Sequence, residues 1–271
     1  MSYISIPSPI VSVTWLYEHL DAENLIVLDG TINKVFDISN NQIPKARFFD
    51  IKNSFSDTEA PFPSTFPSES QFTKEAQALG IHKNSAIVVY DDKGIYSSAR
   101  VWWLFKAMGH KNVAVFNGGF PEWEKAHLST EKSKIFKIKM GDFVANYQQK
   151  YMVFFEGMQT ASKNKTHTIM DARSKERFLS LVDEPREGLR RGTIPNSVNL
   201  PFKNLITGNR LKDSNELEPI FNALAKKEDP IIFSCGSGIT ACILALGADM
   251  SDYKNISVYD GSWTEWGSLV P

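Results

Sequence analysis

The sequence predicts an α/β protein with two tandem domains, each a mostly parallel sheet flanked by helices. The first observation is a series of short apolar runs, rich in β-branched residues, which alternate with segments of helical pattern. Such runs are typical of strands buried on both faces. The second observation is that the same order of segments occurs twice, each later segment lying 142 to 151 residues after its counterpart. A period of this length indicates two domains rather than a solenoid.

The first half contains four expected strands and four expected helices. The strands are 25–29, 43–50 after a turn, 86–92 and 113–116, and the helices are 13–20, 70–79, 98–108 and a short one after 117. Ser12 or Thr14 is the expected cap of the first helix. Residues 52–70, rich in Pro, Ser and Phe, are expected to form a long loop.

The second half repeats these segments. The matched pairs are 168–171 with 26–29, 193–200 with 42–49, 230–235 with 86–91 and 254–266 with 111–123. The lysine-rich stretch between the halves has the composition of a linker. We therefore expect a domain at 1–130, a linker at 131–150 and a second domain at 151–271.

Composition excludes several classes of protein. Thirty basic and thirty-one acidic residues leave a net charge of −1. The sequence therefore predicts no global electrostatic attraction to nucleic acid or to an anionic membrane. No signal peptide pattern and no apolar run of membrane-spanning length occurs. Cys235 and Cys242 are the only cysteines, which provides neither a disulfide framework nor a metal site. We expect a cytoplasmic protein with reduced thiols and without a metal or other cofactor.

The central candidate site is the stretch Cys235-Gly-Ser-Gly-Ile-Thr240, which follows the apolar run 231–233 and precedes an apolar helix from Ala241. Because glycines allow a tight turn, successive backbone N–H groups can point at one centre at the N-terminus of that helix. Such a ring of donors stabilises an anion and favours the nucleophilic thiolate. The sequence therefore predicts a reactive cysteine.

Two other motifs fit this stretch less well. Residues 236–241 match the dinucleotide-binding pattern G-x-G-x-x-A, but too few residues follow to build the strands of that fold. A cysteine phosphatase would place an arginine at position 241, which is alanine here. In the first half the counterpart of Cys235 is Asp91, which cannot carry sulfur, so we expect chemistry in the second domain only.

An anionic substrate would need cations, and residues 236–240 have none. The candidates are the arginines that precede the loop in the second half: Arg173, Arg177, Arg186, Arg190 and Arg191. An arginine offers a planar fork that matches a carboxylate, although most arginines are surface charges or structural ion-pair partners. We assign that structural role to Arg173, Arg190 and Arg191. For Arg177 and Arg186, the resemblance described next implies that they bind substrate.

The tandem repeat, the cysteine loop and these arginines resemble the rhodanese superfamily, and within it the 3-mercaptopyruvate sulfurtransferases. The similarity covers nearly the whole chain, from Trp15-Leu-x-x-His-Leu20 through Ser98-Ala-Arg-Val-Trp-Trp103 to Tyr259-Asp-Gly-Ser-Trp263. Thiosulfate-using rhodaneses carry basic residues directly after the cysteine, where this chain has Gly236 and Ser237.

The resemblance implies a mechanism. Arg177 and Arg186 would hold the carboxylate and ketone of mercaptopyruvate while the Cys235 thiolate takes its sulfur and a pyruvate enolate leaves. Ser237 would pass a proton, and Thr240 would either hydrogen-bond the sulfur or only cap the helix. The loop that stabilises the charge comprises Gly236, Ser237, Gly238, Ile239 and Thr240. The persulfide would then pass sulfur to cyanide or to a thiol acceptor such as thioredoxin, and we expect a monomer.

The chain departs from the family at several positions. An aspartate and a histidine often found in the first domain correspond to Lys52 and Pro63, and a histidine and a glycine of the second correspond to Thr193 and Ser180. Two alternatives stay open, a thiosulfate sulfurtransferase and a non-catalytic persulfide relay. Cys242 is expected to be a core residue, and a resolving thiol is its alternative role.

Overall fold

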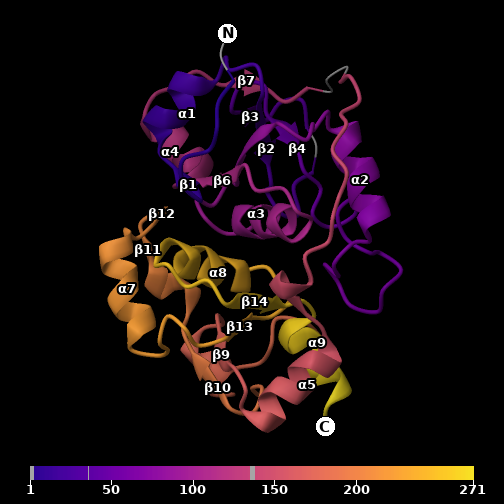
Figure 1. Ribbon diagram of the computed structural model, residues 1–271, viewed down its shortest axis with the longest axis vertical. Helices are drawn as coiled ribbons and strands as arrows, with labels where there is room; N and C mark the ends of the chain where they lie inside the picture. The colour runs from indigo at the N-terminus through magenta and orange to yellow at the C-terminus, as the bar shows by residue number, and fades with distance from the viewer. Residues whose placement is uncertain (1–2, 36, 135–137) are drawn as a thin grey trace. The chain divides into compact units, whose positions relative to one another are not determined.

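A computed structural model describes residues 3–35, 37–134 and 138–271 of the chain (Figure 1). It divides into two compact units. Unit 1 comprises Met1–Thr58, Phe66–Gln148 and Gly208–Arg210, and unit 2 comprises Glu59–Thr65, Gln149–Thr207 and Leu211–Pro271. The predicted linker 131–150 includes residues 135–137, which lie outside the described residues.

Each unit contains a five-stranded sheet in which every pairing is parallel. The order in unit 1 is β1 (Ile10–Val11), β6 (Val113–Phe116), β5 (Ala86–Tyr90), β2 (Leu25–Asp29) and β4 (Arg47–Phe48). The order in unit 2 is β8 (Met152–Val153), β14 (Ile256–Tyr259), β13 (Ile231–Ser234), β9 (Thr168–Asp171) and β10 (Ser197–Asn199). The two orders are the same, which confirms the predicted α/β fold and its internal repeat.

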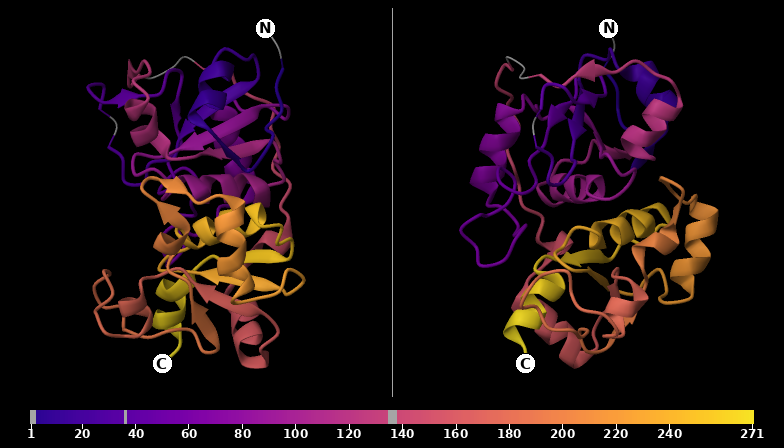
Figure 2. Two further views of the ribbon diagram at one scale, coloured as in Figure 1. Left: turned by 90° about the vertical axis from the view of Figure 1, so that its left-hand side faces the viewer. Right: turned by 180° about the vertical axis from the view of Figure 1, so that it is seen from behind.

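Helices cover both faces of the unit 1 sheet (Figures 1 and 2). Helices α1 (Val13–His19) and α4 (Gly119–Lys125) pack on the face that presents Val27 and Val88. Helices α2 (Glu69–Ala78) and α3 (Ser98–Ala107) contact each other through Phe72 and Phe105, with ring centroids 5.1 Å apart. Successive residues of a strand point to opposite faces of the sheet. Because β5 is apolar along its whole length, it buries side chains on both faces.

The unit 2 sheet is covered in the same way. Helices α5 (Phe155–Asn164) and α9 (Ser262–Leu269) pack with Ile169 and Ile232. Helices α7 (Ser214–Asn222) and α8 (Ala241–Met250) pack together, and Phe221 of α7 reaches Phe233 of β13 at 6.4 Å between ring centroids. The remaining elements are short: β3 (Asn41–Gln42), β7 (Glu131–Lys132), η1 (Gln149–Tyr151), α6 (Lys175–Phe178), η2 (Phe202–Leu205), β11 (Ile206–Thr207) and β12 (Arg210–Leu211).

Local sequence explains several helix ends. The Ser12 hydroxyl accepts the Trp15 N–H at 3.1 Å, which identifies Ser12 rather than Thr14 as the cap of α1. Sequence reasoning did not predict α7, although Glu216 accepts the Asp213 N–H at 3.3 Å in a capping arrangement that its sequence encodes. Among the described residues, no helix is both long and apolar enough to span a bilayer.

We expect His110 to make the stability of unit 1 depend on pH. The ring packs between Phe105 and Phe143, with centroids 5.8 and 5.4 Å away, and its Nε2 lies 2.9 Å from the Ser85 carbonyl. Burial lowers the pKa of His110. The unfolded chain therefore binds this proton more readily, so the free energy of unfolding falls as pH drops below about 6.5. Denaturant titrations at several pH values are expected to show a flatter profile for His110→Asn than for the unsubstituted protein.

The comparison between the two proteins isolates His110. Burial also lowers the pKa of His167, but this histidine is present in both and its contribution cancels in the difference. Identical pH profiles would show that the His110 ring is as easily protonated in the folded chain as in the unfolded one.

Candidate active site

Cys235 follows β13 directly, at the carboxyl end of the central strand of the unit 2 sheet. Helix α8 begins at Ala241, so residues 235–240 form the turn between strand and helix. The cysteine is 1% exposed, whereas Gly236, Ser237 and Thr240 are partly exposed. Carboxyl ends of parallel strands are where α/β proteins place their active sites. The predicted strand, turn and helix are thus confirmed around Cys235.

The first residues of α9 form hydrogen bonds with the cysteine loop. The Ser262 hydroxyl accepts the backbone N–H groups of Cys235 and Gly238, both at 3.1 Å, and its oxygen lies 3.8 Å from the Cys235 sulfur. The Trp263 N–H donates to the Cys235 carbonyl at 3.0 Å. The Thr264 N–H and hydroxyl both donate to the Gly236 carbonyl, at 2.9 and 2.6 Å. Five hydrogen bonds therefore fix the loop relative to α9.

Ser262 holds this position with a left-handed backbone, at φ 51°. Its counterpart in unit 1 is Gly119, at φ 56°, the residue type that adopts this conformation without steric cost. The strain of a serine in this conformation is offset by the two hydrogen bonds that its hydroxyl accepts from the loop. Sequence reasoning did not single out Ser262. The available signal was the alignment of the two repeats, which sets a serine against a glycine.

Four loop N–H groups, those of Gly236, Ser237, Ile239 and Thr240, have no acceptor within the part of the chain that the structure describes. The expectation that all five loop N–H groups face the sulfur needs one correction. The N–H of Gly238 donates to Ser262, which leaves it engaged by the protein itself.

Unit 1 shows what a loop of this shape binds. Asp91 occupies the place of Cys235, and its carboxylate is fully buried. It accepts the backbone N–H groups of Lys93, Tyr96, Ser97 and Ser98 at distances of 2.8 to 3.0 Å. In unit 1 the turn between strand and helix is therefore an anion cradle that the chain fills with its own carboxylate.

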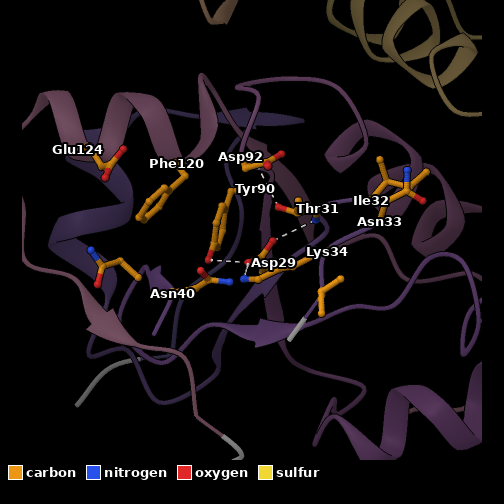
Figure 3. A pocket seen from close by; sticks show the side chains of 12 residues that line it. Asp29, Thr31, Ile32, Asn33, Lys34, Asn40, Tyr90, Asp92, Phe120 and Glu124 are labelled. Atoms are coloured by element: carbon orange, nitrogen blue, oxygen red, sulfur yellow. Dashed lines mark hydrogen bonds and ion pairs between the residues drawn. The ribbon is translucent and has the colours of Figure 1, made fainter. Parts of the chain in front are cut away.

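A pocket of unit 1 lies beside this turn, at the carboxyl ends of β2 and β5 (Figure 3). Asp29 is its central group, and Lys34 and the Tyr90 hydroxyl point at it. The Tyr90 oxygen is 3.2 Å from Asp29, which also accepts the Thr31 N–H at 3.0 Å. These contacts satisfy the acid, and the pocket contains no nucleophilic sulfur, in agreement with the prediction that unit 1 lacks the catalytic cysteine.

Arg177, on the short helix α6, lies against the cysteine loop. A carbon attached to Gly236 would be 3.1 Å from its Nη2. The guanidinium pairs with Glu184 through Nε at 3.3 Å and through Nη2. Its side chain is 25% exposed, while that of Glu184 is 1% exposed. Arg177 is therefore a partly exposed cation beside the residue that follows Cys235.

The other arginines of the second half have different surroundings. Arg173 is buried, bonded to Asp171 and Glu184, and stacked 4.8 Å from the Trp263 ring. Arg190 lies on the same ring and donates to the Val270 carbonyl, and Arg191 pairs with Asp183 at the surface. Arg186 is exposed, and its side chain has no partner among the described residues. The structure thus shows Arg177 beside the loop, and the substrate-binding role of Arg186 stays a prediction.

The hydroxyls and the second thiol of the loop region also have defined surroundings. Thr240 sits at the N-cap position of α8 without a side-chain capping bond, so capping is not its role. The Ser237 and Thr240 hydroxyls have no hydrogen-bond partner in the described part of the chain. Cys242 is fully buried, and its sulfur lies 3.3 Å from the Gly238 carbonyl. This burial agrees with its interpretation as a core residue.

Comparison with known proteins adds the family. Residues 12–126 and 156–269 match the rhodanese-like domain. The 3-mercaptopyruvate sulfurtransferase of Escherichia coli K12 is 35% identical over 267 residues, 95% of this chain and 94% of the relative. The thiosulfate sulfurtransferase of Rattus norvegicus is 35% identical over 280 residues, 97% of this chain and 93% of the relative. The crystal structure of SseA from Escherichia coli has a TM-score of 0.84 and 32% identity, covering 94% of this chain and 99% of that one.

The chain therefore belongs to the rhodanese family, with two rhodanese-like domains in tandem. It is a sulfurtransferase, an enzyme that moves sulfur from a donor to a thiol acceptor. The resemblance on which the sequence analysis relied is confirmed.

Proposed function

We propose that this enzyme takes the sulfur of 3-mercaptopyruvate onto Cys235, releases pyruvate, and passes the sulfur to a thiol or to cyanide. The observation that carries this proposal is the Arg177 guanidinium beside Gly236, next to a cysteine whose own loop has no charge. A guanidinium matches a planar carboxylate in a bidentate fashion. An α-keto acid donor supplies that carboxylate.

In the first step the Cys235 thiolate attacks the sulfur of the donor. A sulfur–sulfur bond forms, the carbon–sulfur bond breaks, and its electron pair leaves on carbon as the enolate of pyruvate. The enolate takes up a proton and becomes pyruvate. The Ser237 hydroxyl, which has no hydrogen-bond partner among the described residues, is our candidate for delivering that proton. Lys52 and Pro63 stand where the family resemblance leads us to expect an acid and a histidine.

Charge on sulfur is stabilised by the loop. The N–H groups of Gly236, Ser237, Ile239 and Thr240, which have no acceptor among the described residues, are available to it. The cradle around Asp91 supports this role for a loop of the same origin. Preorganised donors of this kind act most strongly at a site that excludes water. The Thr240 hydroxyl, free of a capping role, is a further donor.

In the second step an acceptor thiolate attacks the outer sulfur of the persulfide, and the Cys235 thiolate leaves. Thioredoxin is the acceptor that we propose, and cyanide would give thiocyanate by the same attack. We further propose that the enzyme is a monomer and works in the cytoplasm, where a reducing environment keeps the Cys235 thiol free.

Thiosulfate is the second candidate donor, since one relative is named for it. Two features support mercaptopyruvate instead. The loop has no basic side chain for a sulfonate. A side chain at position 236 would also meet Arg177 at 3.1 Å, so the glycine is suited to a guanidinium lying on the loop. The relay alternative is disfavoured, because the relatives are enzymes and a relay needs no carboxylate-binding arginine.

Replacing Arg177 by alanine is expected to raise the KM for 3-mercaptopyruvate roughly 10- to 100-fold, because a charge-assisted hydrogen bond is worth about 1.5 to 3 kcal/mol. The assay is pyruvate release with dithiothreitol as acceptor, beside thiocyanate formation from thiosulfate and cyanide. Arg191→Ala, which removes a surface arginine paired with exposed Asp183, is the matched control and is expected to leave KM unchanged.

Two outcomes contradict the proposal. A preference of the unsubstituted enzyme for thiosulfate would identify the wrong donor. An Arg177→Ala enzyme with unaltered KM would show that the carboxylate is bound elsewhere, and the exposed Arg186 would be the next residue to replace.

A further inference from the structure

Four side chains of alternating charge connect the end of β9 to the cysteine loop. Asp171, at the end of β9, binds Arg173, with 2.9 Å between Oδ2 and Nε. The Arg173 Nη1 donates to Glu184 at 2.8 Å, and Glu184 binds Arg177. Only the last member of the row is appreciably exposed, since the side chains of the other three are 1% exposed.

The inner end of this row is rigid. Arg173 is held by Asp171 on one edge, by the Gly192 carbonyl at 3.0 Å and by the Trp263 ring at 4.8 Å. Glu184 is attached to this anchored guanidinium through Oε1. A buried carboxylate needs such a partner, because an isolated buried charge is strongly unfavourable. The position of Glu184 is therefore set by the core of unit 2.

The outer end of the row determines where Arg177 can be. Glu184 engages Nε and Nη2, which are one edge of the Arg177 fork. A guanidinium has five N–H donors, so three remain for a ligand. Nη2 is also the atom nearest to the position that a side-chain carbon on Gly236 would occupy. Arg186 provides a contrast, since its side chain has no ion pair or hydrogen bond among the described residues.

We infer that Glu184 is a positioning residue, whose carboxylate holds the Arg177 guanidinium on the loop beside Cys235 in the orientation that receives the donor's carboxylate. This inference rests on the proposed function, because it concerns binding of the same donor. Glu184 itself need not touch substrate. Orientation of a binding group before the substrate arrives lowers the entropic cost of binding.

Removing the charge of Glu184 distinguishes a positioning role from a purely electrostatic one, because the two roles predict changes of opposite sign in the KM for the donor. If Glu184 only neutralised Arg177, Glu184→Gln would leave an uncompensated cation and would lower the KM for an anionic donor. If Glu184 positions Arg177, the same substitution frees the guanidinium and raises KM about tenfold, as misplacement of a binding group does.

The test is steady-state pyruvate release from 3-mercaptopyruvate by the full chain, with KM and kcat determined separately. We expect KM to rise about tenfold in Glu184→Gln while kcat changes less than twofold. Glu184→Asp retains the charge but is one methylene shorter, and it is expected to raise KM as well. In an Arg177→Ala background Glu184→Gln is expected to have no further effect on KM, because the two residues act as one unit.

A second measurement needs no sulfur donor. Iodoacetate and iodoacetamide alkylate thiols alike but differ in one carboxylate, so their rate ratio at Cys235 reports the positioned cation. We expect Glu184→Gln to lower this ratio severalfold and to leave the iodoacetamide rate unchanged. Asp183→Asn, an exposed neighbour that pairs with Arg191, is the matched control and is expected to change neither quantity.

The outcomes separate the two proposals. An unsubstituted enzyme that releases no pyruvate from mercaptopyruvate would overturn the proposed function, while the alkylation ratio would still test Glu184. A lowered KM, or a raised alkylation ratio in Glu184→Gln, would overturn the positioning role. So would a KM effect that persists undiminished in the Arg177→Ala background. A lower iodoacetamide rate would place the effect on the cysteine loop, and it too would overturn the role.

Discussion

Substituting Cys235 with serine is expected to reduce sulfur transfer from any donor at least ~10³-fold. The residue lies at the carboxyl end of the central strand, in the loop where the N–H groups of Gly236, Ser237, Ile239 and Thr240 have no acceptor among the described residues. Its sulfur is the atom that would carry the persulfide. A serine oxygen fits the same loop but is neither a comparable nucleophile nor able to form a persulfide. The measurement is pyruvate release with dithiothreitol, compared with the rate without enzyme.

The matched control is the second cysteine. Cys242 is fully buried, and its sulfur donates to the Gly238 carbonyl, a bond that a hydroxyl can also make. Cys242→Ser is therefore expected to retain most activity. Equal losses in both variants would contradict the assignment of a single sulfur carrier and would favour a role for Cys242 as a resolving thiol.

Substituting Ser262 with alanine is expected to destabilise unit 2 by about 2 to 4 kcal/mol, because the buried N–H groups of Cys235 and Gly238 both lose their acceptor. Ser262→Gly loses the same acceptor but relieves the left-handed strain at φ 51°. It is therefore expected to be about 1 kcal/mol more stable than the alanine variant. This reverses the usual preference for alanine over glycine within a helix. Equilibrium denaturation, with Cys235 alkylation as a second probe, measures both differences.

Ser268→Ala provides the control, because it removes a hydroxyl from the same helix. That hydroxyl donates to the Thr264 carbonyl at 2.7 Å, and no backbone N–H depends on it in the described structure. Its loss is expected to cost less than about 1 kcal/mol. An alanine variant at 262 that is more stable than the glycine variant would show that the backbone there is not strained.

The fold was predictable because local pattern and internal repetition gave the same answer. Strands such as β5 and β13 can be recognised in the sequence as short runs of apolar, β-branched residues. The alignment of the two halves then placed Cys235 opposite Asp91, and the structure shows the same turn at both positions. Helices α5 and α7 were not predicted. The start of α5 has no side-chain capping bond, whereas Asp213 and Glu216 form a capping box at the start of α7 that the prediction missed.

The candidate site was predictable only in part, for a physical reason. The cysteine loop is contiguous, so its sequence displays both the nucleophile and the glycines around it. Ser262 lies 27 residues further on and Glu184 precedes the loop in a run of charges, so neither is distinguished by its neighbours. Arg177 and Arg186 are equivalent in sequence terms. The difference between them is the buried Glu184, which pairs with Arg177 and fixes its position, whereas Arg186 has no such partner among the described residues.

The most direct test of the proposed sulfur transfer is the mass of the enzyme after exposure to 3-mercaptopyruvate without an acceptor. The expected result is a gain of one sulfur atom, located on the peptide that contains Cys235, together with one equivalent of pyruvate. The added mass should disappear when dithiothreitol is supplied. Release of pyruvate with an acceptor present, but with no added sulfur on Cys235 in its absence, would contradict the persulfide route and require direct transfer between donor and acceptor.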